Sequence, residues 1–118
     1  MKLATSVPDF TIRSAIVDDC TQILSFIQEL ADYEKLGHEV VATPATLEET
    51  LFGEKAYAEV TIGEYQGKAI GYSLFFHNFS TFTGRPGIYL EDIYVQPSMR
   101  GKGCGKLMLA YIAKLAVE

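Results

Sequence analysis

The stretch that decides the fold runs from Tyr89 to Leu109 and reads YLEDIYVQPSMRGKGCGKLML. Its first part is rich in β-branched and aromatic residues and ends at Val95, before Pro97, which predicts a strand. A glycine-rich basic loop follows, and then an amphipathic helix. A helix start offers unpaired N–H groups and the positive end of the helix dipole. This order therefore predicts an anion-binding site.

Two common phosphate motifs fail on spacing. A P-loop anchored on Gly105 and Lys106 would need glycine where Arg100 stands and a hydroxyl residue where Leu107 stands. A dinucleotide fingerprint would need a further glycine where the sequence has Lys106 or Met108. Neither motif describes the loop.

What remains is Arg100-x-x-Gly103-x-Gly105 directly after a strand, which resembles the pyrophosphate loop of the GCN5-related N-acetyltransferase (GNAT) family. Phe10–Arg13 followed by Asp18-Asp19-Cys20 is similar to the first strand and helix of that family. Two other segments resemble its spermidine/spermine and thialysine acetyltransferase branch; they are Ala31-Asp32-Tyr33-Glu34 and Tyr89-Leu90-Glu91-Asp92.

The resemblance implies acetyl-CoA as cofactor, bound by strand and loop together. The main chain of Ile93 and Val95 would pair with the pantetheine amides, and the Val95 N–H would polarise the acetyl carbonyl. Backbone N–H groups of the loop would cradle the pyrophosphate. The full set of predicted cofactor-binding residues is Ile93, Tyr94, Val95, Arg100, Gly101, Lys102, Gly103, Cys104, Gly105 and Lys106.

Glu91 and Asp92 are the predicted catalytic pair. Glu91 corresponds to the residue that the polyamine branch uses as a base, acting through water, and a carboxylate there would also attract an ammonium group. Adjacent strand residues point to opposite faces, so only one of the two can face the substrate unless the strand is bulged. The alternative is a structural ion pair with Arg13 or Lys68 across the sheet.

The predicted substrate contacts are Phe82 and Glu91. The resemblance places an acid and a tryptophan in the loop where this sequence has Ser80 and Phe82. Because that acid is missing, a small amine or a lysine-like amino acid is as good a candidate as a polyamine. Cys104 is a packing residue in this interpretation, since no histidine lies near it in the sequence.

The rest of the chain predicts an α+β domain with the order β-α-α-β-β-β-α. Residues 1–9 show no periodicity and are expected to form a loose tail before the domain at 10–118. The predicted elements are strands at 10–13, 56–65, 69–77 and 88–95, and helices from 18 or 19 to about 36, from 44 to 52 and from 103 to 117, with a loop at 80–87. The last helix is expected to bury Leu107, Leu109, Ala110, Ala113 and Ala116 or Val117.

Composition restricts the partners. The chain has 118 residues and a net charge of −5, which argues against nucleic acid. Outside the basic loop it carries seven basic and 15 acidic residues, a balance that suits an anionic cofactor and a cationic substrate. No apolar run is long enough to span a bilayer, and no signal peptide is recognisable, so we expect a cytoplasmic protein without a membrane partner. His38 and His77 have no metal-ligand spacing with Cys20 or Cys104, so no metal site is expected.

The family fold continues with a further strand, a helix and two more strands, and this sequence offers no match to the tyrosine of that helix, which protonates the leaving thiolate. We therefore expect one sheet edge and one face of the last helix to lack their usual cover. Such surfaces favour association, which predicts a homodimer. The alternatives to an N-acetyltransferase are a non-catalytic module that binds CoA or only self-associates, a cofactor-free structural subunit, or a fragment of a longer product.

Overall fold

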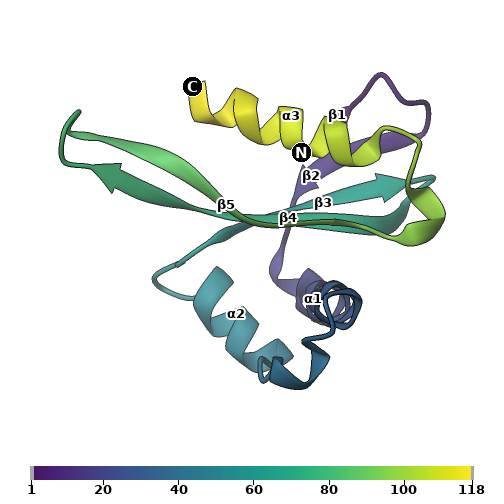
Figure 1. Ribbon diagram of the computed structural model, residues 1–118, viewed down its shortest axis with the longest axis horizontal. Helices are drawn as coiled ribbons and strands as arrows, with labels where there is room; N and C mark the ends of the chain where they lie inside the picture. The colour runs from purple at the N-terminus through teal and green to yellow at the C-terminus, as the bar shows by residue number, and fades with distance from the viewer. Residues whose placement is uncertain (1, 118) are drawn as a thin grey trace.

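In the part of the chain that the structure describes, three helices cover the two faces of a five-stranded antiparallel sheet, which gives three layers (Figure 1). The structure is a computed structural model and describes residues 2–117, so Met1 and Glu118, the outer limits of the predicted tail and domain, lie outside it. The elements are β1 (Lys2–Ala4), β2 (Phe10–Ser14), α1 (Cys20–Tyr33), α2 (Pro44–Phe52), β3 (Glu59–Tyr65), β4 (Lys68–Ser80), β5 (Arg85–Val95) and α3 (Cys104–Val117), with short 3₁₀ turns at Val17–Asp19, Gly37–Glu39 and Pro97–Met99. The predicted α+β class is confirmed.

The strands follow one another in sequence order across the sheet, β1-β2-β3-β4-β5, and every neighbour is antiparallel. The turn between β3 and β4 has positive φ at Gln66 (52°) and Gly67 (78°), the conformation of a tight two-residue hairpin turn. The predicted start of α2 is also confirmed, because Thr43 Oγ1 accepts a hydrogen bond of 3.1 Å from the Thr46 N–H and Pro44 begins the helix.

The sheet has a separate apolar core on each face. Figure 1 shows α1 and α2 on one face and α3 on the other. The first core comprises Cys20, Ile23, Phe26, Leu47, Leu51, Val60, Ile62, Tyr72 and Tyr94, and the second comprises Phe10, Ile12, Ile70, Val95, Met99, Cys104 and Met108. Consecutive residues Tyr94 and Val95 thus belong to opposite cores, which fixes the orientation of the end of β5.

Three expectations from the sequence are corrected. The predicted tail contains β1, whose Leu3 pairs with Ile12 of β2, because pairing satisfies backbone groups that periodicity does not reveal. Half of the predicted loop at 80–87 is strand, since β4 continues to Ser80 and β5 begins at Arg85. In α3 the buried residues are Cys104, Met108 and Ile112, whereas Leu109 is 51% exposed. The helix is apolar on nearly every side, so its pattern did not identify the face that meets the sheet.

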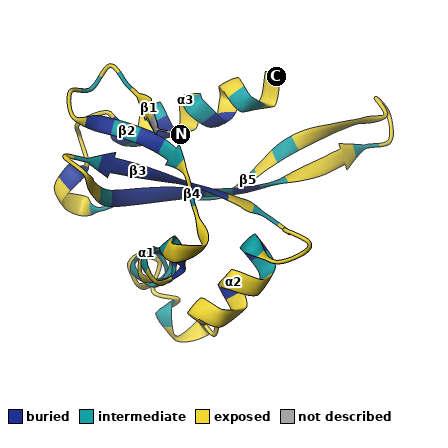
Figure 2. Cartoon of the chain, turned by 180° about the vertical axis from the view of Figure 1, so that it is seen from behind, coloured by how far each residue is buried: buried dark blue, intermediate teal, exposed yellow. Residues whose placement is uncertain are grey.

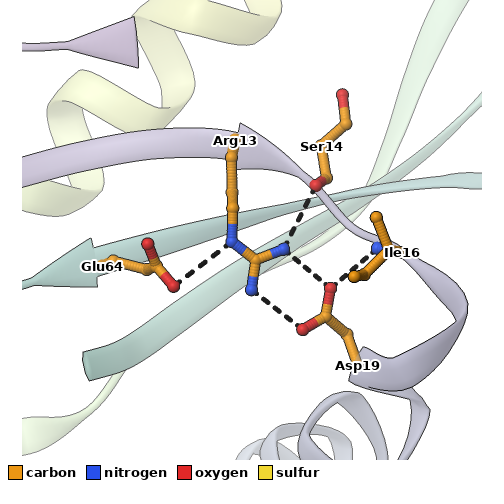
Figure 3. A network of polar contacts seen from close by, with 5 residues as sticks. All are labelled: Arg13, Ser14, Ile16, Asp19 and Glu64. Carbon is orange, nitrogen blue, oxygen red and sulfur yellow. Dashed lines mark hydrogen bonds and ion pairs between the residues drawn. The ribbon is translucent and has the colours of Figure 1, made fainter. Parts of the chain in front are cut away.

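An ion network joins β2, β3 and the turn before α1 (Figure 3). The Arg13 guanidinium donates hydrogen bonds of 2.7 and 2.8 Å to the two Asp19 carboxylate oxygens and one of 3.2 Å to Glu64 Oε2. Asp19 also accepts a hydrogen bond of 2.7 Å from the Ile16 N–H. Arg13 therefore holds these structural acids, and neither Glu91 nor Asp92 is its partner.

The outer part of the β4–β5 hairpin extends beyond both helical layers and is exposed for most of its length (Figure 2). Phe79 is 65% exposed and Tyr89 50%, while the Tyr89 ring stacks on that of Phe76 at 5.0 Å. Nearer the body of the protein, Leu74 pairs with Asp92 but Phe75 pairs with Leu90. Glu91 is thus the additional residue of a β-bulge.

Candidate functional site

A cavity of about 470 Å³ opens beside the end of β5, where the sequence predicts the cofactor. It lies among the strand end, the start of α3 and the last turn of α1. Its lining residues are Leu30, Tyr33, Ile93, Tyr94, Val95, Arg100, Gly105, Lys106 and Leu109. Six of the ten predicted cofactor-binding residues are in this set, and the volume is that of a typical small-molecule site.

The backbone of β5 presents hydrogen-bonding groups along this cavity. Among the described residues β5 pairs only with β4, so it is an edge strand. The Gln96 N–H donates to the Ile70 carbonyl at 2.8 Å, and hydrogen-bonded and non-hydrogen-bonded pairs alternate along an antiparallel ladder. Tyr94 therefore faces β4 with its main-chain groups, whereas Ile93 and Val95 direct theirs toward the open edge. An extended ligand could add there as a strand does.

The loop between β5 and α3 adopts backbone conformations that favour glycine. Gly101 and Gly103 have φ values of 83° and 84°, which residues with a Cβ rarely adopt. Gly105 is different, because a Cβ there would meet only Val95 Cγ2, at an ordinary 3.7 Å. The protein's own packing does not require glycine at 105, whereas close approach of a ligand to the start of α3 would.

Two of the three loop cations reach the cavity. Arg100 lines it, with Cζ 4.9 Å from the Tyr33 ring centre and 5.8 Å from that of Tyr94, and its Nε donates to the Val95 carbonyl at 3.1 Å. Lys106 lines the cavity from the first turn of α3. Lys102 does not, because its ammonium lies 5.9 Å from the centre of the Tyr65 ring.

Cys104 begins α3 but is buried in the core beneath it, at 1% exposure. Burial raises the pKa of its thiol, and the nearby Lys102 lowers it by less. The packing interpretation of this cysteine is confirmed, and any contact with a cofactor would fall to its backbone. Within residues 2–117 no group of three or more His, Cys, Asp or Glu side chains could hold a metal ion.

The two predicted catalytic acids occupy different environments. Asp92 Oδ2 accepts a hydrogen bond of 3.0 Å from the Tyr72 hydroxyl, on the side of the sheet covered by α1. Burial, together with the nearby Asp92 carboxylate, raises the pKa of Tyr72, so the phenol stays protonated and donates. Glu91 is exposed and sits on the bulge. The sequence predicts that the two acids face opposite sides of the sheet unless the strand is bulged, and β5 has such a bulge at Glu91.

Phe82 lies elsewhere. It is fully exposed in the turn between β4 and β5, where the Gly84 N–H donates to the Ser80 carbonyl at 2.8 Å. In Figure 1 this turn is at one end of the hairpin and the basic loop follows the other end. The structure does not bring Phe82 to the cavity, so its contact with substrate stays a prediction.

The sequence did not predict that α1 contributes one wall of the cavity. Leu30 and Tyr33 line the cavity, and Glu29, one position earlier, accepts a hydrogen bond of 2.7 Å from the Tyr94 hydroxyl. Burial, and then the hydrogen bond to Glu29, raise the pKa of Tyr94 to about 12. The only signal in the sequence was the Ala31–Glu34 segment at the end of the helix, which carried a family likeness but no role.

These features together define a class of protein fold. In it, the edge strand of an antiparallel sheet leads into a glycine-rich helix start beside a cavity. The profile of the Acetyltransferase (GNAT) family matches residues 23–118. The chain belongs to this family, whose members generally use acetyl-CoA. No helix within residues 2–117 has the length and apolar character to cross a membrane.

Individual relatives agree with that assignment. Thialysine N-epsilon-acetyltransferase of Sus scrofa is 41% identical over 115 residues, a match covering 91% of this chain and 67% of the pig protein. Spermidine/spermine N(1)-acetyltransferase-like protein 1 of Homo sapiens is 32% identical over 96% of this chain and 17% of its own length. Ribosomal-protein-alanine N-acetyltransferase from Brucella melitensis shares the fold, with a TM-score of 0.74 and 21% identity over 92% of this chain and 71% of that one.

Proposed function

We propose that this protein is an N-acetyltransferase that moves an acetyl group from acetyl-CoA to a primary amine of a small molecule. The observation that carries the proposal is the coincidence of an open strand edge, a helix start and two cations around one cavity. The family and the relatives support acetyl transfer as the chemistry.

The residues present fit acetyl-CoA. The first N–H groups of α3, with Arg100 and Lys106, form a positive site suited to the pyrophosphate. The outward main-chain groups of Ile93 and Val95 suit the pantetheine amides. When bound, the cofactor supplies an activated acetyl thioester, and the Val95 N–H would polarise its carbonyl.

Glu91 is the proposed base. An amine arrives as an ammonium ion and must lose a proton before its nitrogen can attack, and an exposed carboxylate can accept that proton through water. Nitrogen then bonds to the acyl carbon, the carbon–sulfur bond breaks, and sulfur leaves with the electron pair. Of the two protons then on nitrogen, one passes to solvent and the other stays as the amide N–H, and the thiolate takes a proton from solvent.

The proposed acceptor is a lysine-like amino acid or a polyamine. Its cationic chain suits a protein that carries 15 acidic residues and a net charge of −5. Negative charge also lies near the cavity, because Glu34 follows Tyr33 at the end of α1 and Asp92 bonds to Tyr72 on the α1 side of the sheet. The name of the pig relative points to a lysine analogue as well.

Calorimetric titration of the purified chain with acetyl-CoA tests the proposal first, followed by acetylation assays on lysine analogues, ornithine and spermidine. We expect saturable binding near one site per chain and product with at least one amine. Binding without product on any amine would instead indicate a coenzyme-binding module. Absence of binding would contradict the proposal.

The predicted homodimer belongs to the same proposal. The exposed aromatic residues of the outer hairpin and the edge of β5 beside them would be covered in it, while the edge at Ile93 and Val95 stays open for the cofactor. Sedimentation equilibrium tests it, and a monomer at every concentration would contradict it. Cytoplasmic residence stays a prediction.

A further inference from the structure

Two side chains at the end of β5 donate hydrogen bonds to one carboxylate of α1, that of Glu29. Glu29 Oε1 accepts a hydrogen bond of 2.7 Å from the Tyr94 hydroxyl and one of 3.5 Å from the Gln96 side-chain amide. Tyr94 and Gln96 are two residues apart, so their side chains lie on the same face of the strand. Between them is Val95, whose side chain belongs to the opposite core. Glu29 therefore holds both neighbours of the residue whose N–H faces the cavity.

We propose that Glu29 is a positioning residue for acetyl transfer, which fixes the Val95 N–H in line with the thioester carbonyl by holding Tyr94 and Gln96. The inference rests on the proposed function and extends it to a side chain that has no contact with the reacting atoms.

Hydrogen bonds hold the strand end around Val95 from three directions, and those on the α1 side go to Glu29. On the β4 side, the Gln96 N–H donates to the Ile70 carbonyl at 2.8 Å. At the open edge, Arg100 Nε donates to the Val95 carbonyl at 3.1 Å. Without Glu29, the Tyr94 ring would keep its packing against Phe26 and Tyr72, but the strand end could rotate about its axis.

Small rotations matter here because a hydrogen bond weakens steeply with angle. A donor that stabilises charge as it develops must already be aligned when reaction begins. Tyr94 suits this role because its raised pKa, about 12, keeps the hydroxyl protonated and donating at neutral pH. A hydrogen bond to a carboxylate is also stronger than one to a neutral acceptor.

The test compares Glu29→Ala, Glu29→Gln and Tyr94→Phe in the full chain. Isotope-edited infrared spectroscopy of bound acetyl-CoA labelled with ¹³C at the carbonyl reports the hydrogen bond to the thioester. In the unmodified protein we expect the carbonyl band to shift to lower frequency on binding. In Glu29→Ala and Tyr94→Phe we expect that shift to shrink and kcat to fall about ten-fold, as for a misaligned reacting geometry.

Affinity for CoA without the acetyl group should be unchanged in Glu29→Ala, because Glu29 does not line the cavity and the loop and the start of α3 are intact. Glu29→Gln keeps an acceptor oxygen and should retain most of the band shift and most of kcat. Asp32→Ala is the matched control, since Asp32 is an acid of the same helix whose carboxylate accepts a hydrogen bond from Gln28 of that helix. Tyr94→Phe keeps the ring and its packing, so it remains informative if Glu29→Ala fails to fold.

The outcomes separate the two proposals. If the unmodified protein does not bind acetyl-CoA, the proposed function fails and the role of Glu29 fails with it. If it binds with a shifted band, and Tyr94→Phe together with any folded Glu29→Ala show the same band and the same kcat, acetyl transfer stands and the positioning role is overturned.

Discussion

The hydroxyl of Tyr72 on β4 donates a hydrogen bond of 3.0 Å to Asp92 on β5, and this contact separates the roles of two adjacent acids. Asp92 is engaged by a phenol that burial keeps protonated. Glu91, the preceding residue, is displaced by the bulge and exposed. The strand thus carries one carboxylate that is hydrogen-bonded within the protein and one that is exposed to solvent.

Replacing Glu91 with Gln should lower kcat by roughly 10²-fold, the usual contribution of a positioned general base. The dissociation constant of CoA should not change, because Glu91 is not among the residues that line the cavity. Steady-state kinetics and calorimetry measure the two quantities. Asp92→Asn is the comparison and should mainly reduce stability, by about 1 kcal/mol, as for a weakened hydrogen bond. Equal turnover in Glu91→Gln and the unmodified enzyme would remove the residue from the mechanism.

Replacing Gly103 with Ala should weaken acetyl-CoA binding at least ten-fold, because the loop would have to leave the left-handed conformation at φ 84°. Gly84→Ala is a matched control, since Gly84 has a φ of 69° with open space around it and lies in the hairpin turn. Both variants should lose about 1 kcal/mol of stability. Calorimetry should show weaker binding of acetyl-CoA in Gly103→Ala alone. Equal affinity in Gly103→Ala and Gly84→Ala would contradict the prediction that the loop binds the pyrophosphate.

Gly105→Ala should weaken the binding of acetyl-CoA without lowering the stability of the fold. The added Cβ would meet Val95 at an ordinary 3.7 Å, and alanine favours helix over glycine, so the free energy of unfolding should stay equal or rise slightly. The methyl group would nevertheless occupy space at the helix start where the pyrophosphate is expected. Urea unfolding and titration with acetyl-CoA measure the two effects. An unaltered affinity would show that no ligand approaches this turn.

Gly71→Ala should destabilise the protein by about 2–3 kcal/mol, in the range of overpacked core sites. A Cβ at 71 would lie 2.3 Å from the main-chain oxygen of Tyr94, so β4 and β5 would have to separate. Gly87→Ala on the outer hairpin is the control, because the nearest atom there, at 2.8 Å, is the side-chain oxygen of Asn78, which can rotate away. Urea unfolding compares them. Equal stabilities would mean that β4 and β5 tolerate the added atom.

Asp19→Asn should reduce how steeply the free energy of unfolding falls as the pH is lowered into the acid range. The hydrogen bond from Arg13 holds the pKa of Asp19 below its ordinary value of 3.8 (Figure 3). A lowered pKa in the folded state contributes stability above pH 3.8 that is lost as the pH falls through the folded value. The variant should be less stable at pH 7, by roughly 3 kcal/mol for a broken part-buried pair. Thermal unfolding from pH 7 to pH 2 measures this, and parallel curves for the two proteins would contradict it.

Sequence alone determined much of the architecture. Thr43-Pro44 set the start of α2, Gly67 set the β3–β4 turn, and the series Val95, Pro97, Gly103 set a strand, a loop and a helix start. These are local signals, since each depends on the backbone preferences of a few neighbouring residues. The glycines at 101 and 103 could be assigned to a tight loop for the same reason.

Tertiary structure alone decided the rest, because it depends on contacts between distant segments. The nearly all-apolar α3 could not indicate that Met108 rather than Leu109 would meet the sheet. Nothing local to Lys2–Ala4 shows that β2 has a free edge for it to pair with. Likewise, Glu29 and Tyr94 are 65 positions apart in the sequence, and only the packing of α1 on the sheet brings that carboxylate to the strand beside the cavity.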